Sequence, residues 1–104
     1  MGKQRPNLTV LEDVGELGDW CFNFSRADIF IRYPSTAVDP VRGDIIHLPI
    51  CEGNSIASPV RWGWNGSEDA PTITPSILVN GGDGQGGRKQ IWHGWLTAGK
   101  LIEA

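Results

Sequence analysis

The chain has 104 residues, of which 39% are hydrophobic and 20% are charged, and its formal net charge is −3. This length suits one domain with a single core. The acidic balance argues against non-specific binding to duplex nucleic acid, because such binding needs a basic face.

No apolar run approaches the roughly 20 residues that a membrane-spanning helix requires. The first seven residues include basic side chains but no apolar stretch follows them, so they do not predict a signal peptide. We therefore expect a protein of the host-cell cytoplasm without membrane contact. In that reducing compartment, Cys21 and Cys51 are expected to be free thiols.

Frequent chain breakers divide the first half of the sequence into short pieces. The chain holds 14 glycines and 7 prolines, which makes long helices improbable. Trp20, Phe22 and Phe24 alternate with polar or small residues, the pattern of a half-buried strand. We predict strands at residues 8–14, 20–24, 28–33 and 44–51, with a loop at 35–43.

The second half continues in the same way. Val60, Trp62 and Trp64 alternate, and Asn65-Gly66 is a turn signal. Residues 72–80 are expected to be extended, with the first half at a sheet edge because of its prolines. A glycine loop at 81–87 precedes a hairpin formed by 91–96 and 100–103. The sequence therefore predicts a single all-β domain, a small antiparallel sandwich or barrel of about seven short strands.

Three motifs carry a resemblance to a known family. They are Trp-x-Trp-Asn-Gly at 62–66, Pro-Thr-x-Thr-Pro-Ser-Ile at 71–77 and His-Gly-Trp-Leu-Thr-x-Gly-Lys-Leu at 93–101. The segment 44–104 resembles small proteins common in tailed-phage genomes, some of which are described as ammonia monooxygenase. The resemblance implies a phage or prophage origin and a β fold, and it implies no particular reaction.

Many members of that family carry cysteine pairs near the first strands and a Cys-His in the late motif, which suggests bound zinc. Here the late motif reads Trp92-His93, and Cys21 has no neighbouring cysteine. His47, His93, Cys21 and Cys51 are the only soft metal ligands, and they lack the usual spacing. We expect no metal and no cofactor, with a zinc-binding or structural phage domain as a remaining alternative.

Four tryptophans lie close to Gly, Arg or His, which is unusual for residues that serve only a core. Their faces could stack on the bases of a ligand, although core packing is the competing interpretation for each. The candidates for ligand binding are Trp62, Trp64, Trp92 and Trp95.

The glycine loop 81–87 is followed by Arg88 and Lys89, and Arg61 precedes the first tryptophan of the set. Backbone N–H groups of such loops and adjacent cations can bind phosphate. The alternatives are an ordinary hairpin connection and solvated basic side chains.

His93 lies next to Trp92 and two residues before Trp95, where it could be a polar contact in an aromatic cleft or a structural histidine. The hydroxyls of Thr72, Thr74 and Ser76 could donate to a ligand or solvate an edge strand. No Ser-His-Asp order or Cys-His pairing is visible, so we expect no catalytic residues and no enzyme.

These observations favour a small phage-type binding protein with an anti-defence role. It would sequester a nucleotide-like ligand in a cleft made by the tryptophans, the cationic residues and the glycine loop. A symmetric homo-oligomer would let two copies enclose one ligand. The alternative is an inhibitor that binds a host defence protein complex, as anti-CRISPR proteins do, with exposed Trp and Arg as anchors.

Overall fold

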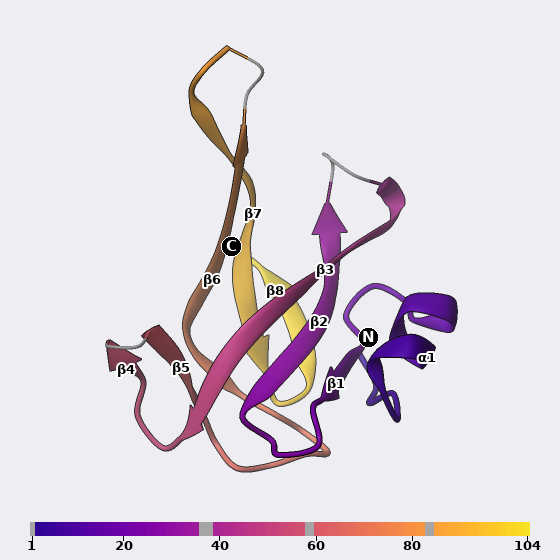
Figure 1. Ribbon diagram of the computed structural model, residues 1–104, viewed down its shortest axis with the longest axis vertical. Coiled ribbons are helices and arrows are strands. Elements are labelled where there is room, and N and C mark those ends of the chain that lie inside the picture. The colour runs from indigo at the N-terminus through magenta and orange to yellow at the C-terminus, as the bar shows by residue number, and fades with distance from the viewer. Residues whose placement is uncertain (1, 36–38, 58–59, 83–84) are drawn as a thin grey trace.

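One twisted sheet forms most of the molecule in the computed structural model, which describes residues 2–35, 39–57, 60–82 and 85–104. Along the sheet the strands follow the order β1-β2-β3-β5-β6-β7-β8, and β4 pairs with β5 (Figure 1). The elements are α1 (Leu8–Val14), β1 (Trp20–Phe22), β2 (Asp28–Ser35), β3 (Asp39–Glu52), β4 (Ile56–Ala57), β5 (Val60–Trp64), β6 (Ile73–Gly82), β7 (Arg88–Thr97) and β8 (Lys100–Glu103).

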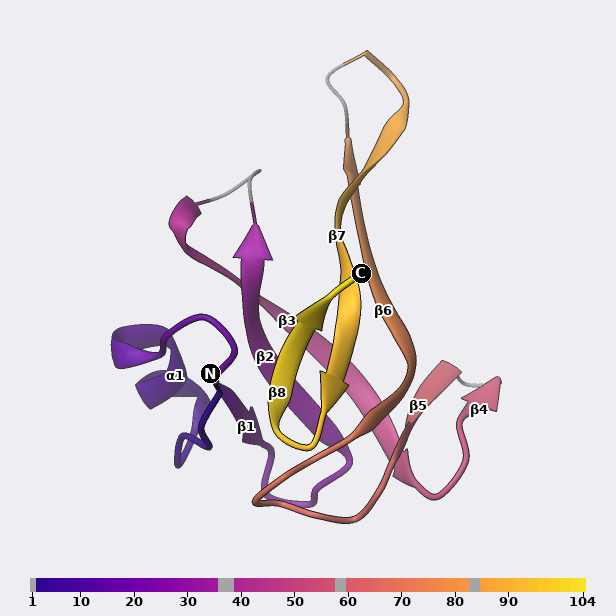
Figure 2. The same ribbon diagram turned by 180° about the vertical axis from the view of Figure 1, so that it is seen from behind.

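The sheet curls into a half-barrel, which Figure 2 shows from the side of β8. Neighbouring strands pair antiparallel except β3 and β5, which run parallel. The curl brings β2 against β7, where the rings of Tyr33 and Trp92 lie 6.0 Å apart. The predicted all-β class is confirmed.

The concave side of the half-barrel holds the core. Alternating residues of β2, Ile29, Ile31 and Tyr33, point into it, as the period of two in a strand requires. Strands on both sides of the curl add the remaining members, which are Trp20, Phe22, Leu48, Ile50, Trp64, Ile73, Ile77, Trp92 and Leu96.

The strand predicted at residues 8–14 is wrong, because Leu8–Val14 is the helix α1. The side chain of Asn7 accepts a hydrogen bond of 3.0 Å from the Val10 N–H and caps the first turn. Leu11 is the buried residue of the helix, and the Arg32 guanidinium donates to its carbonyl oxygen. The Asn7 cap and the buried contact of Leu11 therefore stabilise a helix here, despite the strand preference of the β-branched residues in this segment.

The loop predicted at 35–43 is shorter than expected. β2 extends to Ser35 and β3 begins at Asp39, and the part of the loop at 36–38 lies outside the described residues. The predicted strand at 44–51 is thus the second part of a longer strand. The remaining predicted strands correspond to β1, β2, β5, β6, β7 and β8.

The hairpin of β6 and β7 projects beyond the body of the sheet (Figure 1). Gly81 and Gly82, predicted as loop, still pair with Lys89 and Arg88. The register shifts between Ile73 and Ile77, so the strand is irregular there. Regular pairing resumes at Ile77 and Leu78, which pair with Gly94 and His93.

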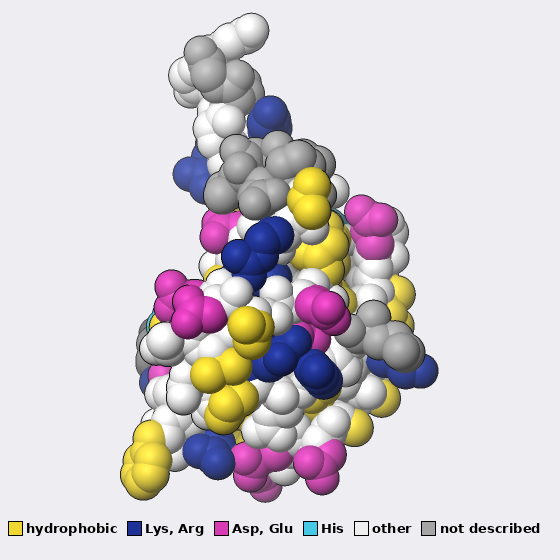
Figure 3. All heavy atoms as spheres, turned by 90° about the vertical axis from the view of Figure 1, so that its right-hand side faces the viewer, with side chains coloured by type: hydrophobic (Ala, Val, Ile, Leu, Met, Phe, Trp, Pro, Cys, Tyr) yellow, Lys and Arg dark blue, Asp and Glu magenta, His cyan; other side chains and the backbone are white. Residues whose placement is uncertain are grey.

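No helix among the described residues is long and apolar enough to cross a membrane. Figure 3 shows the side of the molecule that carries α1, where basic and acidic side chains alternate without a large area of one sign.

Candidate functional site

The centre of the site is a serine hydroxyl hydrogen-bonded to a histidine imidazole. Ser76 of β6 and His93 of β7 lie on neighbouring strands, and Ser76 Oγ is 2.9 Å from His93 Nε2. Both side chains are half-buried, so the pair remains accessible from solvent. A serine hydroxyl hydrogen-bonded to an imidazole is the minimal arrangement of nucleophile and general base.

The pairing register of the two strands explains why these two side chains meet. Leu78 pairs with His93, so Ser76 lies diagonally across from the imidazole on the same face of the hairpin. The register shift around residues 74–76 includes a cis peptide bond between Thr74 and Pro75.

Two tryptophans support the pair. The Trp62 indole Nε1 donates to the main-chain carbonyl oxygen of Ser76 at 3.4 Å, which ties β5 to the serine. The Trp95 ring lies 5.6 Å from the His93 ring with a 39° tilt. Trp95 is 38% exposed and flanks the imidazole on the outer face of β7.

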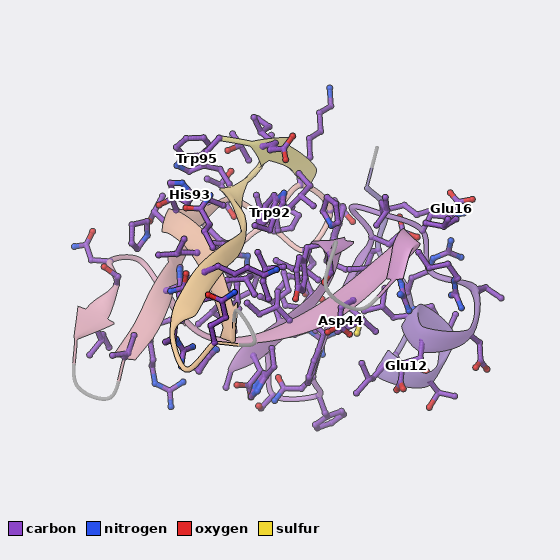
Figure 4. The ribbon with its side chains drawn as sticks, turned by 90° about the horizontal axis from the view of Figure 1, so that it is seen from above. Glu12, Glu16, Asp44, Trp92, His93 and Trp95 are labelled. Carbon is purple, nitrogen blue, oxygen red and sulfur yellow. The ribbon has the colours of Figure 1, made fainter. Side chains whose placement is uncertain are left out.

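The structure records no carboxylate bonded to His93 within the described ranges of the chain. Figure 4 shows His93 and Trp95 on the outer side of β7, whereas Trp92 points into the interior. Glu12, Glu16 and Asp44 lie at the other side of the molecule, around α1. In the part of the chain that the structure describes, the site is therefore a Ser–His pair without an acidic third member.

The basic residues predicted to bind phosphate do not gather at this pair. Arg88 and Lys89 are exposed at the beginning of β7, where they pair with Gly82 and Gly81 in the projecting part of the hairpin. Arg61 is half-buried, and its guanidinium lies 3.5 Å from the carbonyl oxygen of Ala27. We predicted that these three cations line one cleft, but the fold separates Arg61 from Arg88 and Lys89.

Two of the predicted stacking residues are part of the core. Trp64 is 7% exposed and Trp92 is 4% exposed, so neither presents a free ring face. The Trp64 indole donates to the Ser67 carbonyl oxygen at 3.0 Å and its ring lies 5.1 Å from that of Phe22. Of the predicted residues, the fold brings together Trp62, His93 and Trp95.

The cysteines take no part in this site. Burial, assisted by the charge of Glu12, raises the pKa of the Cys21 thiol to about 11, so it stays protonated near neutral pH. Cys21 and Cys51 are both free thiols, as predicted. His47 is 2.7 Å from an oxygen of Asp28, and no metal-binding cluster occurs among the residues described.

A serine hydroxyl within hydrogen-bond distance of a histidine is an arrangement that serine hydrolases use for nucleophile and general base. The chain belongs to the family described as bacterial ubiquitination-like system serine protease (BubE), whose sequence profile matches residues 40–104. Ser76 and His93 both lie inside the matched segment. The two other comparisons, with curated proteins and with solved structures, gave no match.

The expectation that the protein is not an enzyme is wrong, because the family is one of serine proteases. Sequence reasoning named both Ser76 and His93 but did not pair them. It looked for a local Ser-His-Asp or Cys-His order, whereas the two residues meet across a hairpin. The available signal was that the glycine loop connects the strands that carry them.

Proposed function

We propose that this chain is a serine protease in which Ser76 is the nucleophile and His93 is the general base. The observation that carries the proposal is the 2.9 Å contact between Ser76 Oγ and His93 Nε2. It occurs within the segment that matches the serine protease family. The contact has the length that proton transfer between a nucleophile and its base requires.

The reaction follows from the pair. Ser76 Oγ attacks the carbonyl carbon of the scissile bond while its proton passes to His93 Nε2. The protonated imidazole then gives this proton to the leaving amine, the C–N bond breaks, and an acyl ester remains on Ser76. Water, deprotonated by His93, hydrolyses the ester and returns Ser76 to its hydroxyl form.

The family description supports a substrate class for this proposal. Because it assigns the family to a ubiquitination-like system, the proposed substrate is a peptide or isopeptide bond at the end of a ubiquitin-like protein. Half-exposed Trp95 beside His93 gives the site an apolar wall for a side chain next to that bond.

A fluorophosphonate probe tests the nucleophile without knowledge of the substrate. We expect one covalent adduct on Ser76, located by peptide mass mapping, and none in Ser76→Ala. His93→Gln should slow labelling by at least ~10²-fold, because a general base contributes about this much or more. Ser55→Ala, at an exposed serine outside the Ser–His pair, is the matched control and should label as the parent does. Folded protein without an adduct at Ser76 would contradict the proposal.

The predicted sequestration of a nucleotide-like ligand, the binding of a host defence protein and the phage origin stay predictions. Nothing in the fold or in the family match tests them.

A further inference from the structure

The upper part of β6 has a strand neighbour on one side only. β5 pairs with β6 only at Thr74 and Ile73, the beginning of the strand. β7, by contrast, pairs with β6 as far as Gly82. Figures 1 and 2 both show β4 and β5 ending low beside β6, while β6 continues upward with β7 alone. Among the described residues, β6 therefore has a free edge that begins just beyond the candidate nucleophile.

The hydrogen bonds of β7 show which main-chain groups lie on that edge. The N–H of Ala104 donates to the carbonyl oxygen of His93 at 2.9 Å, so the main chain of His93 faces β8. Main-chain groups alternate in direction along a strand, so the two neighbours of His93 face β6. Leu78 pairs with His93 and therefore directs its own N–H and C=O away from β7, toward the free edge.

A contact from β5 gives the same result independently. The Trp62 indole reaches the carbonyl oxygen of Ser76 from the side of β5. Ser76 and Leu78 are two residues apart, so their main-chain groups point in the same direction. The N–H and C=O of Leu78 are thus the first free pair beyond the nucleophile.

We propose that an extended segment of the substrate binds as an added strand along this free edge of β6, paired with the main chain of Leu78. The inference rests on the proposed protease function and specifies how the substrate is held. Strand addition to a sheet edge is a common mode of peptide recognition, in which main-chain hydrogen bonds provide most of the affinity.

The geometry of the edge suits the reaction. The peptide groups of an added strand lie near the plane of the sheet, and the Ser76 hydroxyl stands on one face of that sheet. An added segment whose scissile peptide group turns toward this face presents its carbonyl carbon to the hydroxyl from above the peptide plane, the direction that nucleophilic attack requires. Leu78 is 49% exposed on the same face, where it can contact a side chain of the bound segment.

The test is Leu78→Pro, which removes the N–H that the added strand would use. Proline is tolerated where an edge N–H faces solvent. The matched control is Glu103→Pro on β8, because the Ala104 hydrogen bond shows that the N–H of Glu103 also points away from β7. Two readouts are compared: fluorophosphonate labelling of Ser76, and cleavage of a peptide library made by tryptic digestion of a bacterial proteome.

We expect Leu78→Pro to reduce peptide cleavage at least ~10-fold and to leave labelling within about twofold of the parent, with Glu103→Pro unchanged in both. If Leu78→Pro does not fold, N-methyl scanning of a cleaved peptide on the parent protein replaces it. One methylated position, that facing the Leu78 carbonyl, should abolish cleavage, while the next position should not.

Cleavage by folded Leu78→Pro at the parent rate would overturn strand addition, as would absent cleavage of every library peptide despite a labelled Ser76. A dimer that is lost in Leu78→Pro while cleavage is unchanged would assign the edge to a second copy and also overturn the proposal. Absence of the Ser76 adduct itself marks failure of the protease function rather than of the edge.

Discussion

Trp62 is the residue that connects the candidate nucleophile to the rest of the sheet. Its indole N–H donates to the Ser76 carbonyl oxygen at 3.4 Å, and its ring packs against the core. The residue contacts the serine through the main chain only, so it acts as a positioning residue rather than a catalytic one. Replacement of Trp62 by Phe keeps an aromatic ring and removes the N–H that donates to Ser76.

We predict that Trp62→Phe lowers kcat about two- to fivefold, which corresponds to roughly 0.5–1 kcal/mol for one long neutral hydrogen bond. KM should stay within twofold, and the melting temperature should change little. Trp64→Phe is the matched control, because its indole donates to Ser67, away from the Ser–His pair. That variant should lower the melting temperature and leave kcat unchanged. Equal kcat values for Trp62→Phe and the parent would remove the positioning role.

At the scale of elements, the hairpin of β6 and β7 holds both reacting side chains, so its packing controls the site. Gly94 of β7 lies next to the outer strand β8. A Cβ at this position would clash with the Ile102 carbonyl oxygen and with the Trp92 ring. Only a glycine lets β8 and Trp92 approach the strand this closely. Gly82, in the projecting part of the hairpin, has no atom within 4 Å of such a Cβ.

Gly94→Ala is therefore expected to destabilise the protein by about 1–3 kcal/mol, the usual cost of overpacking, and to slow Ser76 labelling because His93 is the adjacent residue. Gly82→Ala should change the free energy of unfolding by less than about 0.5 kcal/mol. Urea unfolding curves of the two variants provide the comparison. A Gly94→Ala protein as stable as the parent would show that β8 can shift outward without cost.

The same hairpin shows how far the sequence alone could predict the site. The alternation of Val60, Trp62 and Trp64 predicted one strand, and the hairpin of 91–96 and 100–103 predicted two more, all of which the structure confirms. The meeting of Ser76 with His93 depends on the pairing register of β6 and β7. Pairing register is a tertiary property, and a shift of one residue would have turned the serine to the other face.

The helix α1 escaped prediction for a related reason. Its residues favour a strand by composition, and the decisive contributions come from the Asn7 cap and from the distant Arg32. The burial of Trp64 and Trp92 was likewise undecidable from spacing, because the curl of the sheet determines which face becomes concave. The sequence thus predicted element type well where alternation was strong, and it predicted neither curvature nor contacts across strands.

At the scale of the whole molecule, the segment that matches the family is shorter than the part of the chain that forms the core. The match covers residues 40–104, which include Ser76, His93 and all strands from β4 onward. Yet β1 and β2 lie before it and fill one end of the half-barrel. Their core residues are Trp20, Phe22, Ile29, Ile31 and Tyr33.

We predict that the fragment 40–104 does not fold by itself. Each large apolar side chain buried in a core contributes about 1.5–3 kcal/mol, so the loss of five exceeds most of the roughly 5–15 kcal/mol that holds a small domain together. The fragment should lack near-ultraviolet circular dichroism and a cooperative urea transition, and its Ser76 should not react with the fluorophosphonate probe.

Adding the peptide 1–39 to this fragment is the control. It shows whether the fragment is unreactive because it lacks these core residues or because the preparation is damaged. β2 pairs with β3 from Asp28 to Ser35, and the N-terminal segment is fastened by Asp19, which accepts from the Arg5 side chain at 2.8 Å. The peptide therefore carries the contacts needed to rebuild the edge, and labelling of Ser76 should return with it. A fragment 40–104 that unfolds cooperatively and labels at the parent rate would mean that β3–β8 form the protease unit alone, with β1 and β2 as an accessory layer.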